Sequence, residues 1–146
     1  MPTVVDDATL LALLTKRAAS PLLRAAESGD VLTTGSWYYR LHRALHDVGS
    51  DGSLSRMAAN LRPAAREALF GLLDDLPSEI VVPGPRLVVP VMGALRVRRR
   101  VNHLTAEALA VALIAGGAIR VTTDSPLLRA ACTELSIPLE LSPPFS

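Results

Sequence analysis

Cysteine is almost absent from this chain of 146 residues, which contains a single one, Cys132. One cysteine excludes an intrachain disulfide and a cysteine-ligated metal cluster, and it favours a reducing compartment, so we expect the protein in the cytoplasm. The opening residues MPTVVDD lack the basic start and apolar centre of a signal peptide. Charged or polar residues interrupt every apolar run before it reaches membrane-spanning length, so we expect no membrane partner.

Aromatic residues make up only 3% of the chain, and its formal net charge is only +1. The core must therefore be built mainly from Leu, Val and Ala. The small net charge does not by itself indicate nucleic acid as a partner, so any such binding must come from local basic patches. The sequence has no Gly-rich phosphate loop and no Gly-x-Ser-x-Gly motif, and it gives no support to a nucleotide hydrolase or a serine hydrolase.

The stretch from His103 to Leu141 carries the clearest structural pattern in the chain. Its Ala- and Leu-rich start predicts a helix at 104–115 that is covered by protein on most sides. The Gly-Gly pair that follows predicts the end of this helix, because glycine adopts the left-handed cap conformation at low cost. Next, the β-branched run at 119–123 predicts a strand that ends in Asp124. An acid at this point stands where open α/β sheets bind ligands.

The same order of strand, acid and helix opens the chain, where an apolar run meets Asp6 and Asp7 and a helix begins near Thr9. Strands that alternate with helices favour a parallel sheet with right-handed crossovers. We therefore expect a single α/β domain over residues 1–146, with about four to five parallel strands sandwiched by helices. The strands are expected at 4–6, 79–82, 119–123 and 137–141, with a short extended piece at 31–34.

The middle of the chain predicts mainly helices. The segment RLVVPVMGAL at 86–95 is ambiguous, because Pro90 suits a first helical turn or a strand edge and not a helix interior. We favour a short helix there, followed by a basic connection at 96–100. GSDGS at 49–53 predicts a loop. Further helices are expected at 21–29, 37–48, 54–60, 63–76 and 126–135.

Four carboxylates are candidate site residues. Asp6, Asp7 and Asp124 follow expected parallel strands, so they should emerge at the same sheet edge. Glu107 lies among apolar neighbours in a first helical turn, where an acid costs free energy unless it is paired or ligated. Mg²⁺ or Mn²⁺ would relieve the repulsion among such oxygens and could activate a water for phosphodiester hydrolysis. The alternative is that Asp6 or Asp7 caps a helix and that Glu107 stabilises a helix N-terminus.

Two segments resemble the PIN domain family, a metal-dependent ribonuclease fold that includes VapC-type toxins of bacterial toxin–antitoxin pairs. VVDDATLLALL is similar to the family's opening strand, catalytic Asp and apolar helix. LTAEALAVALIAGGAIRVTTDSPLLRAACTELSIPL is similar to its acid-bearing helix, Gly turn, strand ending in T-x-D and final helix. The resemblance implies an endoribonuclease in which Asp6 or Asp7, together with Glu107 and Asp124, forms the catalytic site and holds Mg²⁺ or Mn²⁺. It also implies a homodimer as the default and allows a cognate antitoxin as a partner.

The chain departs from that family's pattern at two positions. The family has an acid in the helix after the second crossover, in a pattern like T-x-x-E, whereas TTGSWYYRLHRAL contains none. Glu107 stands where the family has Asp. Two functions therefore stay open: a metal-dependent ribonuclease, weak or inactive without the missing acid, and a degenerate fold retained as a binding or scaffold module.

Two basic segments are candidate RNA contacts. Arg40 lies among aromatic residues in WYYRLHR, a composition that could stack bases or bind phosphates. The alternative is that Trp37 and Leu41 face the core while Arg40 is solvated. RVRRRVNH, with Arg98, Arg99 and Arg100, leads into the Glu107 helix and could follow a phosphate backbone; a solvated charged loop is the alternative.

Two of the three histidines share one face of an expected helix. His42 and His46 are spaced i, i+4, which is a weak pattern for a zinc site. The sequence offers no evident third ligand for them. We therefore do not predict a zinc site from this pair.

Overall fold

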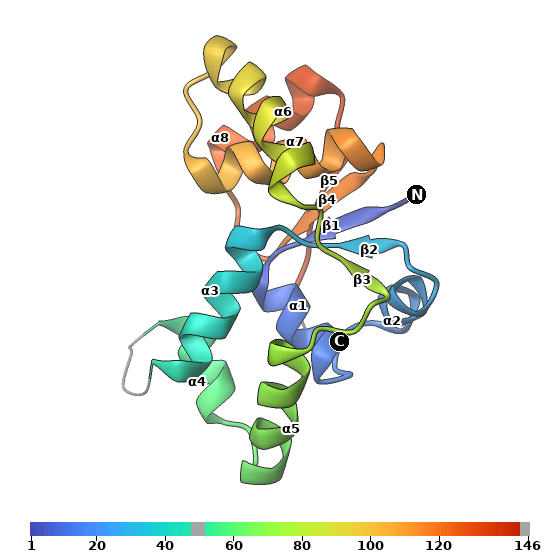
Figure 1. Ribbon diagram of the computed structural model, residues 1–146, viewed down its shortest axis with the longest axis vertical. Coiled ribbons are helices and arrows are strands. Elements are labelled where there is room, and N and C mark those ends of the chain that lie inside the picture. Colours follow the sequence, from blue (N-terminus) through green and yellow to red (C-terminus); the bar gives the residue numbers. More distant parts are fainter. Residues whose placement is uncertain (48–51, 144–146) are drawn as a thin grey trace.

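The computed structural model describes residues 1–47 and 52–143 and contains one sheet of five parallel strands (Figure 1). The strand order is β3-β2-β1-β4-β5, so the first strand of the chain lies in the centre. This architecture confirms the expected α/β class and the parallel sheet. The strands are β1 (Thr3–Val5), β2 (Val31–Leu32), β3 (Ile80–Val81), β4 (Ala118–Val121) and β5 (Leu139–Leu141).

Helices cover both faces of this sheet (Figure 1). The last three, α6 to α8, pack on one face, and α1 and α2 pack on the other; α4 and α5 extend away from the sheet beside α3. In the described ranges the helices are α1 (Asp7–Leu14), α2 (Ser20–Glu27), α3 (Gly35–His46), α4 (Ser53–Ala59), α5 (Pro63–Asp74), α6 (Pro85–Arg98), α7 (His103–Ala115) and α8 (Pro126–Leu135).

Two apolar cores result, because successive residues of a strand face opposite sides of a sheet. Val4 packs in the core beneath α6, α7 and α8, whereas Val5 packs in the core with α1. Both valines are fully buried. Parallel strands covered on both faces have such continuous apolar runs.

The middle of the α7 helix is buried on every side, from Ala106 to Ala112, as its Ala- and Leu-rich sequence predicts. Asn102 caps its start by accepting a hydrogen bond from the Thr105 amide at 2.8 Å. Gly116 ends it with a positive φ of 64°. The next residue, Gly117, passes so close to the start of the chain that a Cβ atom there would lie 2.9 Å from the carbonyl carbon of Pro2 and closer still to its oxygen.

The helix favoured at 86–95 is confirmed, but it is longer than expected, and the basic connection predicted at 96–100 was wrong over residues 96–98. One helix runs from Pro85 to Arg98 with Pro90 inside it, so residues 96–98 belong to its last turn and are not a connection. A proline deprives a helix of one hydrogen bond, the one to the carbonyl four residues earlier. Here that loss falls near the exposed start of the helix, while Val88, Met92 and Leu95 are buried at helical spacing. Burial of this apolar stripe offsets the missing bond.

Three further points concern the loop expected at 49–53, membrane-spanning helices and the single cysteine. Residues 49–51 of the expected loop lie outside the described part of the chain. Within that part, no helix has both the length and the apolar character that crossing a bilayer requires. Cys132 is buried, and burial raises the pKa of its thiol to about 11, which disfavours the thiolate form that reacts as a nucleophile.

Candidate functional site

A pocket of about 280 Å³ opens at the carboxyl ends of β1 and β4, in the middle of the sheet. The chain leaves β1 into α1 on one face and β4 into α8 on the other, so this is the point where open α/β sheets form a crevice. Asp6, Asp7 and Asp124 all line the pocket, together with Arg40 of α3. The sheet therefore brings three of the four candidate carboxylates to one edge.

The protein itself supplies three hydrogen bonds to the Asp6 carboxylate. One carboxylate oxygen accepts a hydrogen bond from the Thr9 amide at 3.0 Å and so caps α1. The other accepts two from Thr122, from its amide and its hydroxyl, each at 2.8 Å. Asp6 is 5% exposed, so these three bonds tie the start of α1 to the end of β4 in a buried setting. This is the capping role that the sequence left open.

Asp7 faces a cation. Burial raises the pKa of its carboxyl above the ordinary value of 3.8, and the neighbouring charge of Asp6 raises it further. The guanidinium of Arg40 acts in the opposite direction, with its Nε atom 3.4 Å from Asp7 Oδ2. Arg40 comes from α3, the helix in which the expected acid is missing. A further acid beside Asp7 would have required a metal ion to neutralise the cluster. The structure has a positive charge there in its place.

Asp124 is the exposed member of the group. Its carboxylate accepts a hydrogen bond from Arg129 in α8 at 2.8 Å, and both side chains are more than half exposed. Ion pairs with this exposure contribute little to stability. Asp124 is free to exchange Arg129 for another cation, whereas Asp6 is not free to leave its three donors.

Glu107 does not line this pocket. One of its oxygens accepts a hydrogen bond from the Ser36 amide at 3.2 Å, and the other accepts from the Ser36 hydroxyl and lies 3.3 Å from His103 Nε2. It lines a separate, mainly apolar pocket of about 440 Å³ between α3, α6 and α7. There the carboxylate stabilises the positive N-terminal end of α3. Gly35 leaves the space for it, because a Cβ at Gly35 would lie 3.3 Å from Glu107 Oε1.

This arrangement does not fit the expected Mg²⁺ or Mn²⁺ ion. Three protein donors use most of the acceptor capacity of Asp6, Arg40 pairs with Asp7, and Glu107 lines another pocket, so of the four candidate acids Asp124 alone is free to exchange its partner. An octahedral ion needs several free oxygens around one point. The catalytic roles of the four acids stay predictions, and we derive no metal-dependent step from them.

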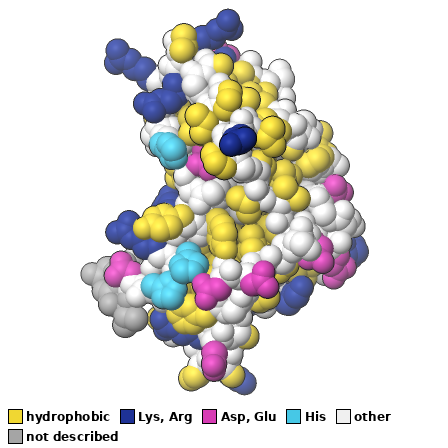
Figure 2. Space-filling model, in the orientation of Figure 1, with side chains coloured by type: hydrophobic (Ala, Val, Ile, Leu, Met, Phe, Trp, Pro, Cys, Tyr) yellow, Lys and Arg dark blue, Asp and Glu magenta, His cyan; other side chains and the backbone are white. Residues whose placement is uncertain are grey.

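The arginines expected to contact RNA have different surroundings. Arg99 forms two hydrogen bonds of 2.9 Å with Glu134 of α8, and its side chain is 15% exposed, so it fastens α8 to the end of α6. Arg98 and Arg100 on either side of it are exposed. Figure 2 shows basic side chains gathered at the end of the molecule where α6 lies in Figure 1.

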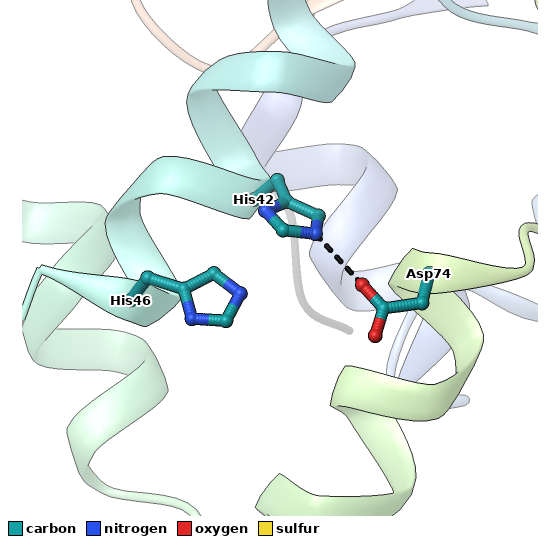
Figure 3. Close-up of side chains that lie close together, drawn as sticks. All are labelled: His42, His46 and Asp74. Atoms are coloured by element: carbon teal, nitrogen blue, oxygen red, sulfur yellow. Dashed lines mark hydrogen bonds and ion pairs between the residues drawn. The ribbon is translucent and has the colours of Figure 1, made fainter.

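The α3 helix confirms the expected orientation of its core residues and adds a group that the sequence pattern did not predict. Trp37 and Leu41 are buried. On another side of the helix, His42 and His46 meet Asp74, the last residue of α5 (Figure 3). Within the described ranges this is the one group of three or more such side chains that could hold a metal ion. The sequence feature that could have indicated this group is the expected helical hairpin before Pro77. Its second helix ends in acidic residues, and the hairpin brings that end back toward the histidines.

No protein-family model matches the chain, and no curated protein matches it either. The function must therefore be argued from the geometry of the pocket and of its surroundings.

Proposed function

We propose that this protein is a PIN-like RNA-binding module whose carboxylate pocket does not cleave RNA through a metal ion. The single observation that carries the proposal is the pairing of Arg40 with Asp7 inside the pocket. The resemblance to the PIN family supports the fold and RNA as the partner. The arrangement of the acids supports binding over hydrolysis.

The charge balance of the pocket supports this choice. A carboxylate-cluster nuclease uses a divalent ion to neutralise its acids and to activate water. Here Arg40 and Arg129 neutralise two acids, and protein donors satisfy Asp6. An arriving cation would have to displace these partners, which costs part of its binding free energy.

The exposed arginines support RNA as the ligand. Arg98 and Arg100 flank the fixed Arg99 at the end of α6. The chain then continues directly to Asn102 and Thr105, which line the carboxylate pocket. A phosphate backbone bound by these arginines would therefore pass beside the pocket mouth.

Replacing both Arg98 and Arg100 with alanine should weaken RNA binding about 10-fold at moderate salt, because each arginine neutralises one phosphate. The slope of log affinity against log salt should also become shallower, by about 0.7 for each phosphate of a single strand that is no longer neutralised. Fluorescence anisotropy with a labelled single-stranded RNA measures both quantities. Arg24→Ala is the matched control, since Arg24 is an exposed arginine on the distant α2. An equal loss in that control, or no binding by the unchanged protein at low salt, would refute the proposal.

The second candidate function is the metal-dependent ribonuclease, which one observation favours: Asp6, Asp7 and Asp124 do share a pocket at the expected sheet edge. The two candidates differ in how they respond to a metal. A ribonuclease would cleave RNA with Mn²⁺, and Asp124→Asn would abolish that cleavage. The binding module would bind RNA without cleaving it.

Replacing Arg40 with glutamate should create a Mn²⁺ site that the unchanged protein lacks, because it replaces the cation beside Asp7 with a fourth acid in the pocket. We expect millimolar Mn²⁺ to leave the melting temperature of the parent unchanged. It should raise that of Arg40→Glu by about 4 °C when Mn²⁺ reaches ten times its Kd. Both are measured with Asp74→Ala present, so that ions at the histidine group do not contribute. Arg40→Gln, which only removes the cation, is the control and should gain less. A comparable rise in the parent would instead favour the ribonuclease.

A further inference from the structure

We propose that His42, His46 and Asp74 form a binding site for a zinc-class transition-metal ion between α3 and α5. Figure 3 shows the two imidazoles extending from α3 toward the carboxylate at the end of α5. His42 Nε2 lies 2.9 Å from Asp74 Oδ1, and one ligand atom from each residue lies within 4.8 Å of the other two. The site is separate from the carboxylate pocket and does not depend on the proposed function.

Small side-chain movements would complete the coordination. Zinc bonds of about 2.0–2.1 Å in a tetrahedron place neighbouring ligand atoms about 3.3 Å apart. The His42–Asp74 pair is already a little closer than this, and the wider separations need closing by at most about 1.5 Å, since they do not exceed 4.8 Å. Asp74 is exposed at 69% and His42 at 35%, so both side chains can rotate without disturbing the core.

Packing already orients the two imidazoles. The His42 and His46 rings lie 4.6 Å apart between centroids, and the His46 ring lies 4.8 Å from that of Phe70. The Phe70 ring is itself approached by the guanidinium of Arg66, 5.8 Å from its centroid. Rings held in this way lose less conformational entropy when they bind an ion.

The donor types select the class of metal. Two imidazole nitrogens and one carboxylate oxygen suit zinc and its transition-metal neighbours, whereas Mg²⁺ requires a larger set of oxygens. The neighbouring Asp75 adds a further negative charge that attracts a cation. Three protein ligands leave a fourth position for water, which is the arrangement of an open zinc site.

A bound ion would fasten α5 to α3. Leu69 and Leu73 of α5 share a core with Leu41 and Leu45 of α3. The Tyr38 hydroxyl also donates to the Leu73 carbonyl. A metal bridge would add a strong bond where the end of α5 meets α3. It should therefore stabilise α4 and α5, the helices that extend away from the sheet, more than the rest of the protein.

Isothermal titration of the untagged, metal-free protein should show one Zn²⁺ bound per chain, with no competition from Mg²⁺. At a zinc concentration one hundred times the Kd, the melting temperature should rise by about 8 °C, because only the folded state brings the three ligands together. Replacing any one of His42, His46 or Asp74 with alanine should weaken binding about 100-fold or more. Co²⁺ in place of zinc should give visible absorption bands that Asp74→Ala abolishes.

Two matched controls separate this site from general metal binding. His103→Ala removes the third histidine, which pairs with Glu107 and lies outside the group, and Asp75→Asn removes the adjacent acid. Both should still bind one zinc ion, with Asp75→Asn weaker by a few-fold. The site does not exist if the unchanged protein binds no zinc, if Asp74→Ala binds as well as the parent, or if His103→Ala loses the ion. Metal-free melting of every variant shows that it folds.

Discussion

Replacing Gly117 with alanine should lower the free energy of unfolding by about 3 kcal/mol, the upper end of the usual cost of overpacking. The new Cβ atom would lie 2.9 Å from the carbonyl carbon of Pro2 and nearer to its oxygen. That oxygen accepts the hydrogen bond from the Ala118 amide at 2.9 Å, which begins the pairing of β1 with β4. Both neighbours are backbone, so neither can move without disturbing the centre of the sheet. Urea denaturation measures the change.

Gly71→Ala is the matched control for this prediction. Gly71 lies on the exposed side of α5, and apart from its own helix's backbone and its chain neighbours a Cβ there would meet no atom within 4 Å. Alanine should therefore stabilise the protein by about 0.5–1 kcal/mol, since it is the better helix former. If Gly117→Ala were as stable as Gly71→Ala, the close approach of residue 117 to Pro2 would be wrong.

Replacing Asp6 with alanine should lower the free energy of unfolding by about 3 kcal/mol, because it leaves the Thr9 and Thr122 donors without their buried acceptor. The sign of this change separates the two roles of Asp6. An acid kept for metal binding would be repelled by its neighbour Asp7, and its removal would stabilise the metal-free protein. Thermal denaturation in the presence of a chelator measures this directly.

Asp7→Asn should have the opposite effect and depend on pH. The folded state raises the pKa of Asp7 above 3.8, chiefly through burial. The folded protein therefore binds this proton more tightly than the unfolded chain does, and stability falls as pH rises from 3.8 through the folded pKa. Asparagine removes this loss, so the variant should be more stable than the parent at neutral pH and equal to it below pH 3.8. If the parent instead gained stability relative to Asp7→Asn as the pH rose above 3.8, the raised pKa of Asp7 would be wrong.

The fold was predictable because its signals are local. The strand before Asp124, the glycines after α7 and the proline at the start of α8 each act within a few residues, and the structure has all of them. Three candidate acids met in one pocket because parallel strands end at one edge. Pro90 was misread because its cost is local, whereas the burial that offsets it comes from distant parts of the core.

The partners of each acid were not predictable, because they come from elsewhere in the chain. No residue near Asp7 in the sequence predicts its contact with Arg40. The sequence around Glu107 likewise does not predict its hydrogen bond with Ser36 in the second pocket. Asp74 joined the two histidines only through the return of α5. The expected RNA, antitoxin and second copy of the chain stay predictions.

The position of β1 also governs the order in which the protein can fold during synthesis. β1 leaves the ribosome before the other four strands, yet one of its two neighbours in the sheet, β4, begins at Ala118. Until that strand emerges, the long buried α7 and one edge of β1 have no complete partner. Contacts this distant in sequence slow folding and leave an open edge exposed to other chains. Fragments that end before β4 should therefore aggregate, and the native core should form only after β4 has emerged.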